Sequence, residues 1–123
     1  MANILIIDDS PTDVRVFTTL LERAGHQVVA VSTAEDGIER VRADLPDLVI
    51  MDVIMPGMNG FQATRTLTRD PATAVVPIVM ITTKSMETDR VWGLRQGAKA
   101  FITKPVNEKE LLACINDLLP SKT

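Results

Sequence analysis

The chain has 123 residues, a net charge of −3 and one cysteine, Cys114. This length predicts a single domain over 1–123, with a core over 3–119 and a short tail over 120–123. One cysteine excludes an intrachain disulfide, and the lack of a basic run argues against nucleic-acid or membrane-surface binding. No apolar run approaches the roughly 20 residues of a membrane span, and no signal-peptide pattern precedes residues 3–7, which indicates a soluble cytoplasmic protein.

Short apolar runs alternate along the chain with longer segments of helical spacing. The runs are residues 3–7, 27–31, 47–51, 76–81 and 99–103. Most are apolar throughout, as expected for strands that helices cover on both faces. We therefore predict one strand from each run.

The segments between the runs carry helix start and stop signals. Ser10 and Pro11 are typical of a helix N-terminus, and Gly25 ends that helix. Asn107 with Glu110 forms a capping box. The other helices are expected to begin near residues 33, 61, 85 and 107. Five alternating strand–helix units predict an α/β fold, a doubly wound parallel sheet flanked by five helices.

Two further side chains have structural interpretations. Trp92 is expected on the flank of the fourth helix, beside a core face made of Val91, Leu94 and Ala98. Cys114 lies among leucines and isoleucine, which predicts a buried, inert thiol.

Polar residues collect where the predicted strands end. Asp8 and Asp9 follow the first run, Asp52 the third, Thr82 the fourth and Lys104 the fifth. Ligands of such folds bind at the carboxyl ends of the strands. These five side chains are therefore expected together at one edge of the sheet.

Three carboxylates at this edge need a counter-charge, because they cannot all ionise cheaply without one. Either one of them is protonated or a divalent cation lies between them. The ligands are hard oxygens with no histidine or cysteine nearby, which selects Mg²⁺ or Mn²⁺ over zinc or copper. Asp52, on the middle strand, is the candidate nucleophile toward phosphorus. Lys104 would balance phosphoryl charge, and Thr82 would donate a hydrogen bond to it.

These motifs, in this order and spacing, are those of a known family. They are Asp8-Asp9, the stretch 52–60, Thr82 and Lys104-Pro105. The chain resembles the receiver domains of bacterial two-component response regulators, in particular single-domain, chemotaxis-type (CheY-like) ones. Residues 60–70 and 82–105 look more narrowly like the regulators of type IV pilus twitching motility.

The resemblance implies the flavodoxin-like strand order 2-1-3-4-5 and the chemistry of the site. Asp52 would accept a phosphoryl group from a histidine kinase. Asp9, Asp52 and the main-chain carbonyl of Ile54 would ligate Mg²⁺, with Asp8 acting through water. The protein would catalyse only its own phosphorylation and slow self-dephosphorylation, so it is not expected to be an enzyme.

The resemblance also implies a switch and a partner. On phosphorylation Thr82 would move toward the phosphoryl group and Phe101 would turn inward. The face formed by the fourth helix, the fifth strand and the fifth helix would then bind a protein partner. The Lys104–Pro105 bond is commonly cis in the family, and a monomer is expected.

Two positions depart from well-known members of the family. Ile54 is apolar where a polar residue often lies, and Lys84 is basic where a glutamate is familiar. Neither side chain is suited to orienting an attacking water molecule. The sequence therefore predicts slow self-hydrolysis of the phosphorylated aspartate.

Other interpretations compete with this one. A magnesium-dependent phosphatase also uses an aspartyl nucleophile, although its second acid typically lies where this chain has Ile54. A receiver-like protein could also bind partners without being phosphorylated, although the complete acceptor set argues against this. Taken singly, Asp8 and Asp9 could be helix N-terminal acids, and Phe101 could be plain core.

Overall fold

The computed structural model describes residues 2–119, in which five strands and five helices alternate. The strands are β1 (Asn3–Ile7), β2 (Gln27–Val31), β3 (Leu48–Met51), β4 (Ile78–Thr82) and β5 (Ala100–Thr103). The helices are α1 (Pro11–Arg23), α2 (Ala34–Asp44), α3 (Gly60–Arg69), α4 (Glu87–Arg95) and α5 (Glu108–Leu118). The tail predicted over 120–123 lies outside the described residues, and the single-domain boundary stays a prediction.

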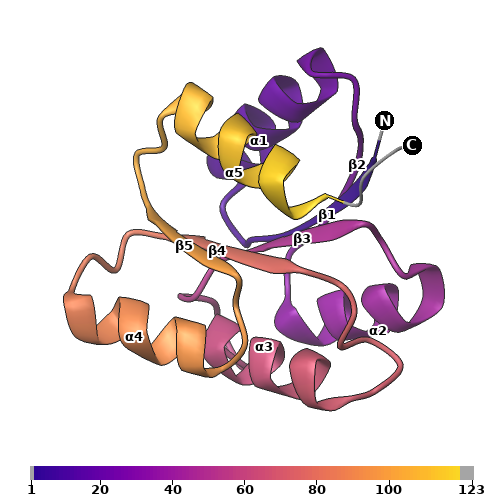
Figure 1. Ribbon diagram of the computed structural model, residues 1–123, viewed down its shortest axis with the longest axis vertical. Helices are drawn as coiled ribbons and strands as arrows, with labels where there is room; N and C mark the ends of the chain where they lie inside the picture. The colour runs from indigo at the N-terminus through magenta and orange to yellow at the C-terminus, as the bar shows by residue number, and fades with distance from the viewer. Residues whose placement is uncertain (1, 120–123) are drawn as a thin grey trace.

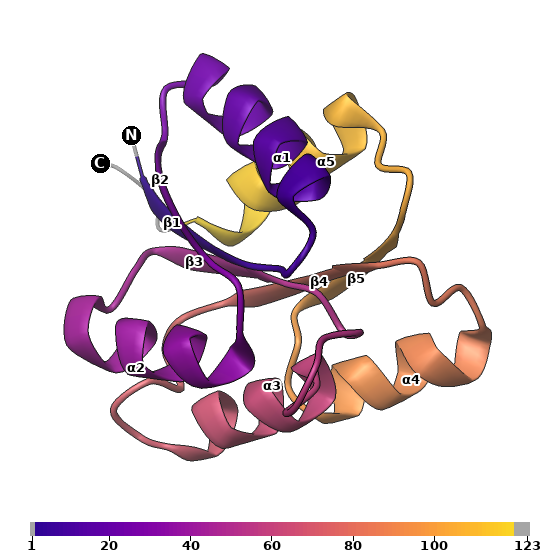
Figure 2. The same ribbon diagram turned by 180° about the vertical axis from the view of Figure 1, so that it is seen from behind.

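The five strands form one parallel sheet in the order β2-β1-β3-β4-β5. Helices α1 and α5 cover one face of the sheet, and α2, α3 and α4 cover the other, as Figure 1 and the reverse view in Figure 2 show. This arrangement confirms the predicted doubly wound fold and its strand order. None of the helices between residues 2 and 119 is both long and apolar enough to cross a membrane.

The sheet separates two apolar layers. Along β1, Ile4 and Ile6 pack in the layer of α1 and α5, whereas Leu5 and Ile7 pack in the layer of α2 and α3. Successive side chains of a strand point to opposite faces, so a strand buried on both faces must be apolar at every position. This is why the central strands are continuous apolar runs.

Edge strand β2 does not share this burial. It pairs only with β1, and Val29 at its centre is 42% exposed. Its apolar sequence, QVVAV, resembles those of the central strands, yet its residues are half-buried or exposed. Full coverage of a strand requires neighbours on both sides, which an edge position does not provide.

The predicted start of α1 is confirmed. Ser10 is the N-cap residue, its hydroxyl accepts a hydrogen bond from the Asp13 backbone N–H at 3.3 Å, and Pro11 is the first helical residue. Proline suits this place because the first backbone N–H groups of a helix have no partner within it. The Asn107 cap of α5 is likewise present, since its side chain accepts from the Glu110 N–H.

Helix α4 differs from the prediction in its start and its core face. Its N-cap is Met86 rather than Ser85, and Met86 makes no side-chain capping bond. Val91, Trp92 and Leu94 are all exposed, with Trp92 at 48%. The helix turns Gly93 toward the sheet, where a Cβ would lie 2.8 Å from the Met80 sulfur. The predicted face of Val91 and Leu94 is therefore wrong, because close approach through glycine decides the rotation of this short helix.

Cys114 is half-buried in α5 rather than fully buried. Burial raises the pKa of its thiol, and the charges of Asp117 and Glu110 raise it further. A raised pKa disfavours the reactive thiolate, in keeping with the predicted inert thiol.

Candidate functional site

The sheet delivers its polar residues to one edge. Asp8 follows β1, Asp52 follows β3 and Lys104 follows β5, while Thr82 is the last residue of β4. The backbone hydrogen bonds of the sheet continue into these positions: Asp8 N–H donates to Val31, Asp52 N–H to Ile7 and Lys104 N–H to Thr82, over 3.1, 2.9 and 2.7 Å. The backbone at the site is therefore as firmly held as the strands themselves.

Asp8, Asp9 and Asp52 form a carboxylate cluster. Each offers one oxygen, and the three oxygens lie within 4.8 Å of one another. Asp8 is 2% exposed and Asp52 is also buried, whereas Asp9 faces solvent. A hard divalent cation with some of its water could bridge oxygens at such separations, so this cluster could hold a metal.

Lys104 is the cation that the protein itself supplies. Its Nζ lies 2.6 Å from Asp13 Oδ2, 3.1 Å from Asp8 Oδ2 and 3.4 Å from Asp52 Oδ2, and its side chain is 11% exposed. Burial lowers the pKa of Lys104, but the hydrogen bonds to Asp13 and Asp8, together with the negative charges of Asp52 and Asp8, outweigh burial and leave the pKa above its ordinary value. The ammonium is therefore charged at neutral pH.

Asp8 is the carboxylate of the cluster whose charged form is disfavoured by its surroundings. Burial raises the pKa of its carboxyl group, and the nearby charge of Asp52 adds to the increase. Hydrogen bonds from the Ser10 N–H, at 2.9 Å, and from Lys104 oppose the increase without cancelling it. One lysine does not neutralise this edge, as the sequence predicted for three clustered acids.

The two oxygens of Asp52 have different surroundings. Oδ1 accepts hydrogen bonds from the Val53 N–H at 2.7 Å and the Ile54 N–H at 3.4 Å, whereas Oδ2 faces the Lys104 ammonium. The loop that follows Asp52 folds back closely at Gly60, so a Cβ there would collide with the Asp52 carbonyl oxygen. The backbone thus fixes one oxygen and leaves Oδ2 beside the cation.

The side chains of Thr82 and Phe101, the two residues of the expected switch, are both buried. Thr82 is fully buried, and its hydroxyl accepts a hydrogen bond from the Lys84 N–H at 3.3 Å. Phe101 is buried against Val53, Met80 and Ala98. Phe101 is therefore already turned inward in this structure, and the switch roles of both residues stay predictions.

The structure also places Ile54 and Lys84, the two residues expected to slow hydrolysis of the phosphorylated aspartate. Ile54 is exposed beside Asp52, and Lys84 forms an ion pair with Asp89 at 3.5 Å. The Lys104–Pro105 bond is cis, as the resemblance implied.

Sequence reasoning missed the part that Asp13 plays. In the sequence, Asp13 is only an acid at the third position of the helix that begins at Pro11, a place where acids are common. The structure puts its carboxylate on Lys104, 91 residues away. The available signal was an extra acid one turn after the Asp8-Asp9 pair, but helix capping explained that acid equally well.

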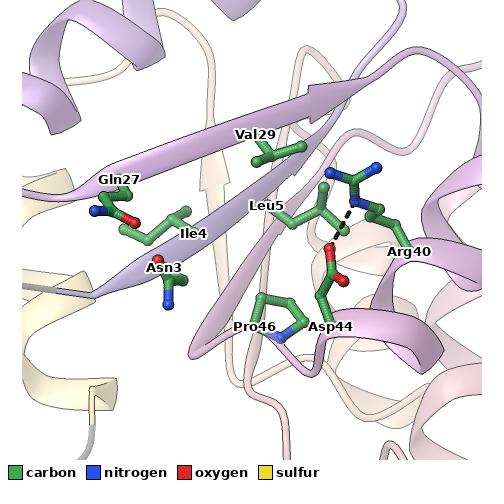
Figure 3. Close-up of a pocket in the computed structure, with 8 residues that line it drawn as sticks. All are labelled: Asn3, Ile4, Leu5, Gln27, Val29, Arg40, Asp44 and Pro46. Atoms are coloured by element: carbon green, nitrogen blue, oxygen red, sulfur yellow. Dashed lines mark hydrogen bonds and ion pairs between the residues drawn. The ribbon is translucent and has the colours of Figure 1, made fainter.

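A cavity of about 220 Å³ lies near the other end of the sheet, between the first residues of β1 and β2 and the end of α2 (Figure 3). Its two charged residues, Arg40 and Asp44, bond each other at 2.7 Å. The charges in this cavity are thus balanced within the protein, unlike those around Asp8 and Asp52.

Comparison with known proteins supports the same assignment. Residues 4–116 match the response regulator receiver domain family. The chain is 53% identical over 119 residues to "Protein PilH" of Pseudomonas aeruginosa, covering 97% of this chain and 98% of that protein. It is also 40% identical over 120 residues to "Response regulator PleD" of Caulobacter vibrioides, and the match covers 26% of that protein.

Solved structures agree on the fold. The chemotaxis protein CheY4 of Vibrio cholerae has a TM-score of 0.89 at 28% identity, over 97% of this chain and 99% of that one. A receiver domain from a Syntrophus aciditrophicus histidine kinase has a TM-score of 0.89 at 33% identity, over 100% and 98%. These matches do not favour the phosphatase or the binder that works unphosphorylated. The chain belongs to the response regulator receiver domain family, whose members act in two-component phosphorelays.

Proposed function

We propose that Asp52 accepts a phosphoryl group from a histidine kinase and that this modification switches a protein-binding surface. The observation that carries the proposal is the meeting of three carboxylates and one lysine from three separate segments, the ends of β1, β3 and β5, at a single edge of the sheet. A purely structural cluster would need no more acids than the lysine can balance.

In the proposed step, Asp52 Oδ2 attacks the phosphorus of a phosphohistidine. A phosphorus–oxygen bond forms and the phosphorus–nitrogen bond breaks. The imidazole nitrogen keeps the electron pair of the broken bond and takes up a proton, so the products are an acyl phosphate and a neutral histidine. The contact with Lys104, at 3.4 Å, supports Oδ2 as the nucleophile, because the ammonium can follow the oxygen charge onto the phosphoryl group.

Asp8, Asp9, Asp52 and the main-chain carbonyl of Ile54 would hold Mg²⁺. When bound, the ion would neutralise the carboxylates and the phosphoryl oxygens. The hard-oxygen character of the cluster supports this choice of metal. Asp8 would act through a water molecule, as the resemblance to receiver domains implies.

The proposed output surface is the face of α4, β5 and α5. Val91, Trp92 and Leu94 are exposed on α4, and exposed apolar side chains gathered on one element are typical of a protein contact. Thr82 is the last residue of β4, at the edge that carries the site, and Phe101 lies on β5, one of the elements of this surface. We propose that they transmit the change, and that the protein acts as a cytoplasmic monomer.

The 53% identity to PilH over nearly the whole length of both chains supports a role in the chemotaxis-like control of pilus-driven twitching motility. The less similar relatives have other names and are longer than this chain, so they support only the receiver chemistry.

Intact-mass spectrometry after incubation with a small acyl-phosphate donor tests the proposal. We expect wild type to gain one phosphoryl group only in the presence of Mg²⁺, and Asp52→Asn to gain none. Asp47→Asn, at the opposite end of the sheet, is the matched control and should behave as wild type. If folded wild type gains no phosphoryl group from either the small donor or a phosphorylated histidine kinase, the proposal is wrong.

A further inference from the structure

The shortest bond to the Lys104 ammonium comes from outside the carboxylate cluster. Asp13 Oδ2 lies 2.6 Å from Nζ, compared with 3.1 Å for Asp8 and 3.4 Å for Asp52. Asp13 belongs to the first turn of α1, where its backbone N–H is already capped by Ser10. A simple helix-terminal acid needs no lysine partner, so capping alone does not explain this contact.

An ammonium group has three N–H donors and no acceptor. In this structure the three carboxylates of Asp8, Asp13 and Asp52 accept hydrogen bonds from Lys104 Nζ. The donors of Lys104 are thus fully engaged before any phosphoryl group arrives. Phosphorylation of Asp52 Oδ2 ends its own bond to Lys104, but the bonds to Asp8 and Asp13 still hold the ammonium. Lys104 can turn fully toward the phosphoryl oxygens only if one of these two remaining bonds is also given up.

Asp13 is the carboxylate that gives up its bond at the lowest cost. Its side chain is 34% exposed, whereas those of Asp8 and Asp52 are almost fully buried. A partly exposed carboxylate that loses an ion pair regains water, whereas a buried one is left without a partner. Asp8 and Asp52 also belong to the candidate metal cluster, and Asp13 does not.

We propose that Asp13 is a positioning residue that holds Lys104 in the unphosphorylated protein and competes with the phosphoryl group for it. This inference rests on the proposed phosphorylation of Asp52. The bond to Asp13 draws the ammonium away from Asp8 and Asp52, which leaves their oxygens more available to a divalent cation. After phosphorylation, the same carboxylate opposes the transfer of Lys104 to the phosphoryl oxygens and repels their charge.

Asp13→Asn separates the two effects, because it removes the charge and keeps the shape. Without the charge, Lys104 settles on Asp8 and Asp52 and competes with Mg²⁺ there, so Mg²⁺ affinity should fall. Lys104 is also free to bind a phosphoryl group, so affinity for beryllofluoride, a tetrahedral mimic of a phosphoryl group on a carboxylate, should rise. Each dissociation constant should change by about fivefold, the upper range for a partly exposed ion pair.

The experiment is a pair of calorimetric titrations on the whole protein: Mg²⁺ alone, and beryllofluoride at saturating Mg²⁺. Glu110→Gln is the matched control, because Glu110 occupies the same position of α5 with a side-chain cap from Asn107, and the change removes the same charge. The control should leave both affinities near wild type. Asp13→Glu keeps the charge and should restore both affinities toward wild type. A thermal melt of each variant checks that it is folded.

Opposite changes in the two affinities for Asp13→Asn would support the proposal. A fall in both affinities would mean that Asp13 only supports the structure of the site, and unchanged values would mean that its bond to Lys104 has no consequence; either result overturns the proposal. If wild type binds Mg²⁺ but not beryllofluoride, the proposed phosphorylation fails first, and Asp13 is then judged by the Mg²⁺ titration. If wild type binds neither, both proposals fall.

Discussion

The two ends of the sheet differ in how their acidic side chains are buried and paired. At the amino end, the acids are at the surface and have local partners: Asp47 accepts the Asn3 N–H at 2.8 Å, and Asp44 binds Arg40. At the carboxyl end, Asp8 and Asp52 are buried and share one lysine with Asp13. Both ends belong to the same strands, so the strand sequence alone does not produce the difference.

This contrast separates an end whose charges are neutralised within the protein from an end that has more acids than its lysine can neutralise. A surface ion pair such as Arg40–Asp44 contributes little to the free energy of unfolding, and its two charges neutralise each other. A buried excess of acids is destabilising unless something else binds. The carboxyl end is therefore expected to lower the stability of the free protein, and under the proposed function a bound cation and a phosphoryl group would offset this cost.

The largest effect should come from Asp9→Asn. Asp9 is the exposed member of the cluster, so its loss should remove a metal ligand with little harm to folding. We expect Mg²⁺ affinity, measured by calorimetry, to fall by at least about tenfold. The free energy of unfolding without metal should stay within about 0.5 kcal/mol of wild type. An unchanged affinity would break the contrast, because the carboxyl end would then have no cation site of this composition.

A smaller effect is expected for the double variant Ile54→Asn, Lys84→Glu. Wild type has an exposed apolar side chain and a lysine paired with Asp89 where polar groups could orient a water molecule. The variant should release phosphate from phosphorylated Asp52 about tenfold faster, since positioning a water molecule lowers the barrier to its attack. Loss of the phosphoryl group can be followed by intact mass. The single variant Lys84→Gln, which adds no acid, is the control, and a double variant as slow as wild type would contradict the prediction.

Asp8→Asn tests the cost of the buried acid. The pKa of Asp8 is raised from its ordinary value of 3.8, so the folded state binds its proton more tightly than the unfolded state does. Stability is then greatest below that value and is lost as the pH rises through it toward the folded pKa. The variant lacks this loss, so its metal-free free energy of unfolding at pH 7 should exceed that of wild type.

Urea denaturation in the presence of a chelator, at pH 3.5 to 7, measures this difference. Asp47→Asn at the amino end is the control and should show no gain, because its carboxylate is not buried. A variant of Asp8 that is less stable than wild type at pH 7 would show that the bond to Lys104 outweighs the burial.

The smallest effect is expected at the amino end. Arg40→Ala removes an exposed pair within one helix, so the free energy of unfolding should change by about 0.5 kcal/mol or less. Mg²⁺ affinity should not change. A marked change in Mg²⁺ affinity would show that the two ends are coupled through β1 and α2.

Much of this molecule could be predicted from its sequence because the signals were local or periodic. Continuous apolar runs gave the buried strands, and Ser10-Pro11 gave the start of α1. Because parallel strands share one carboxyl edge, Asp8, Asp52 and Lys104 had to meet once the strands were placed. The strand order and the roles of Ile54 and Phe101 came instead from resemblance to a family.

Other features depended on tertiary contacts that no local pattern contains. The exposure of Val29 follows from the edge position of β2, and the rotation of α4 follows from the close approach of Gly93 to Met80. The sequence by itself determined which charged groups meet at the carboxyl edge, because their places are fixed by strand ends. Only the tertiary structure decided how Lys104 divides its three donors among them and brought in Asp13, since these bonds depend on distances between side chains from different elements.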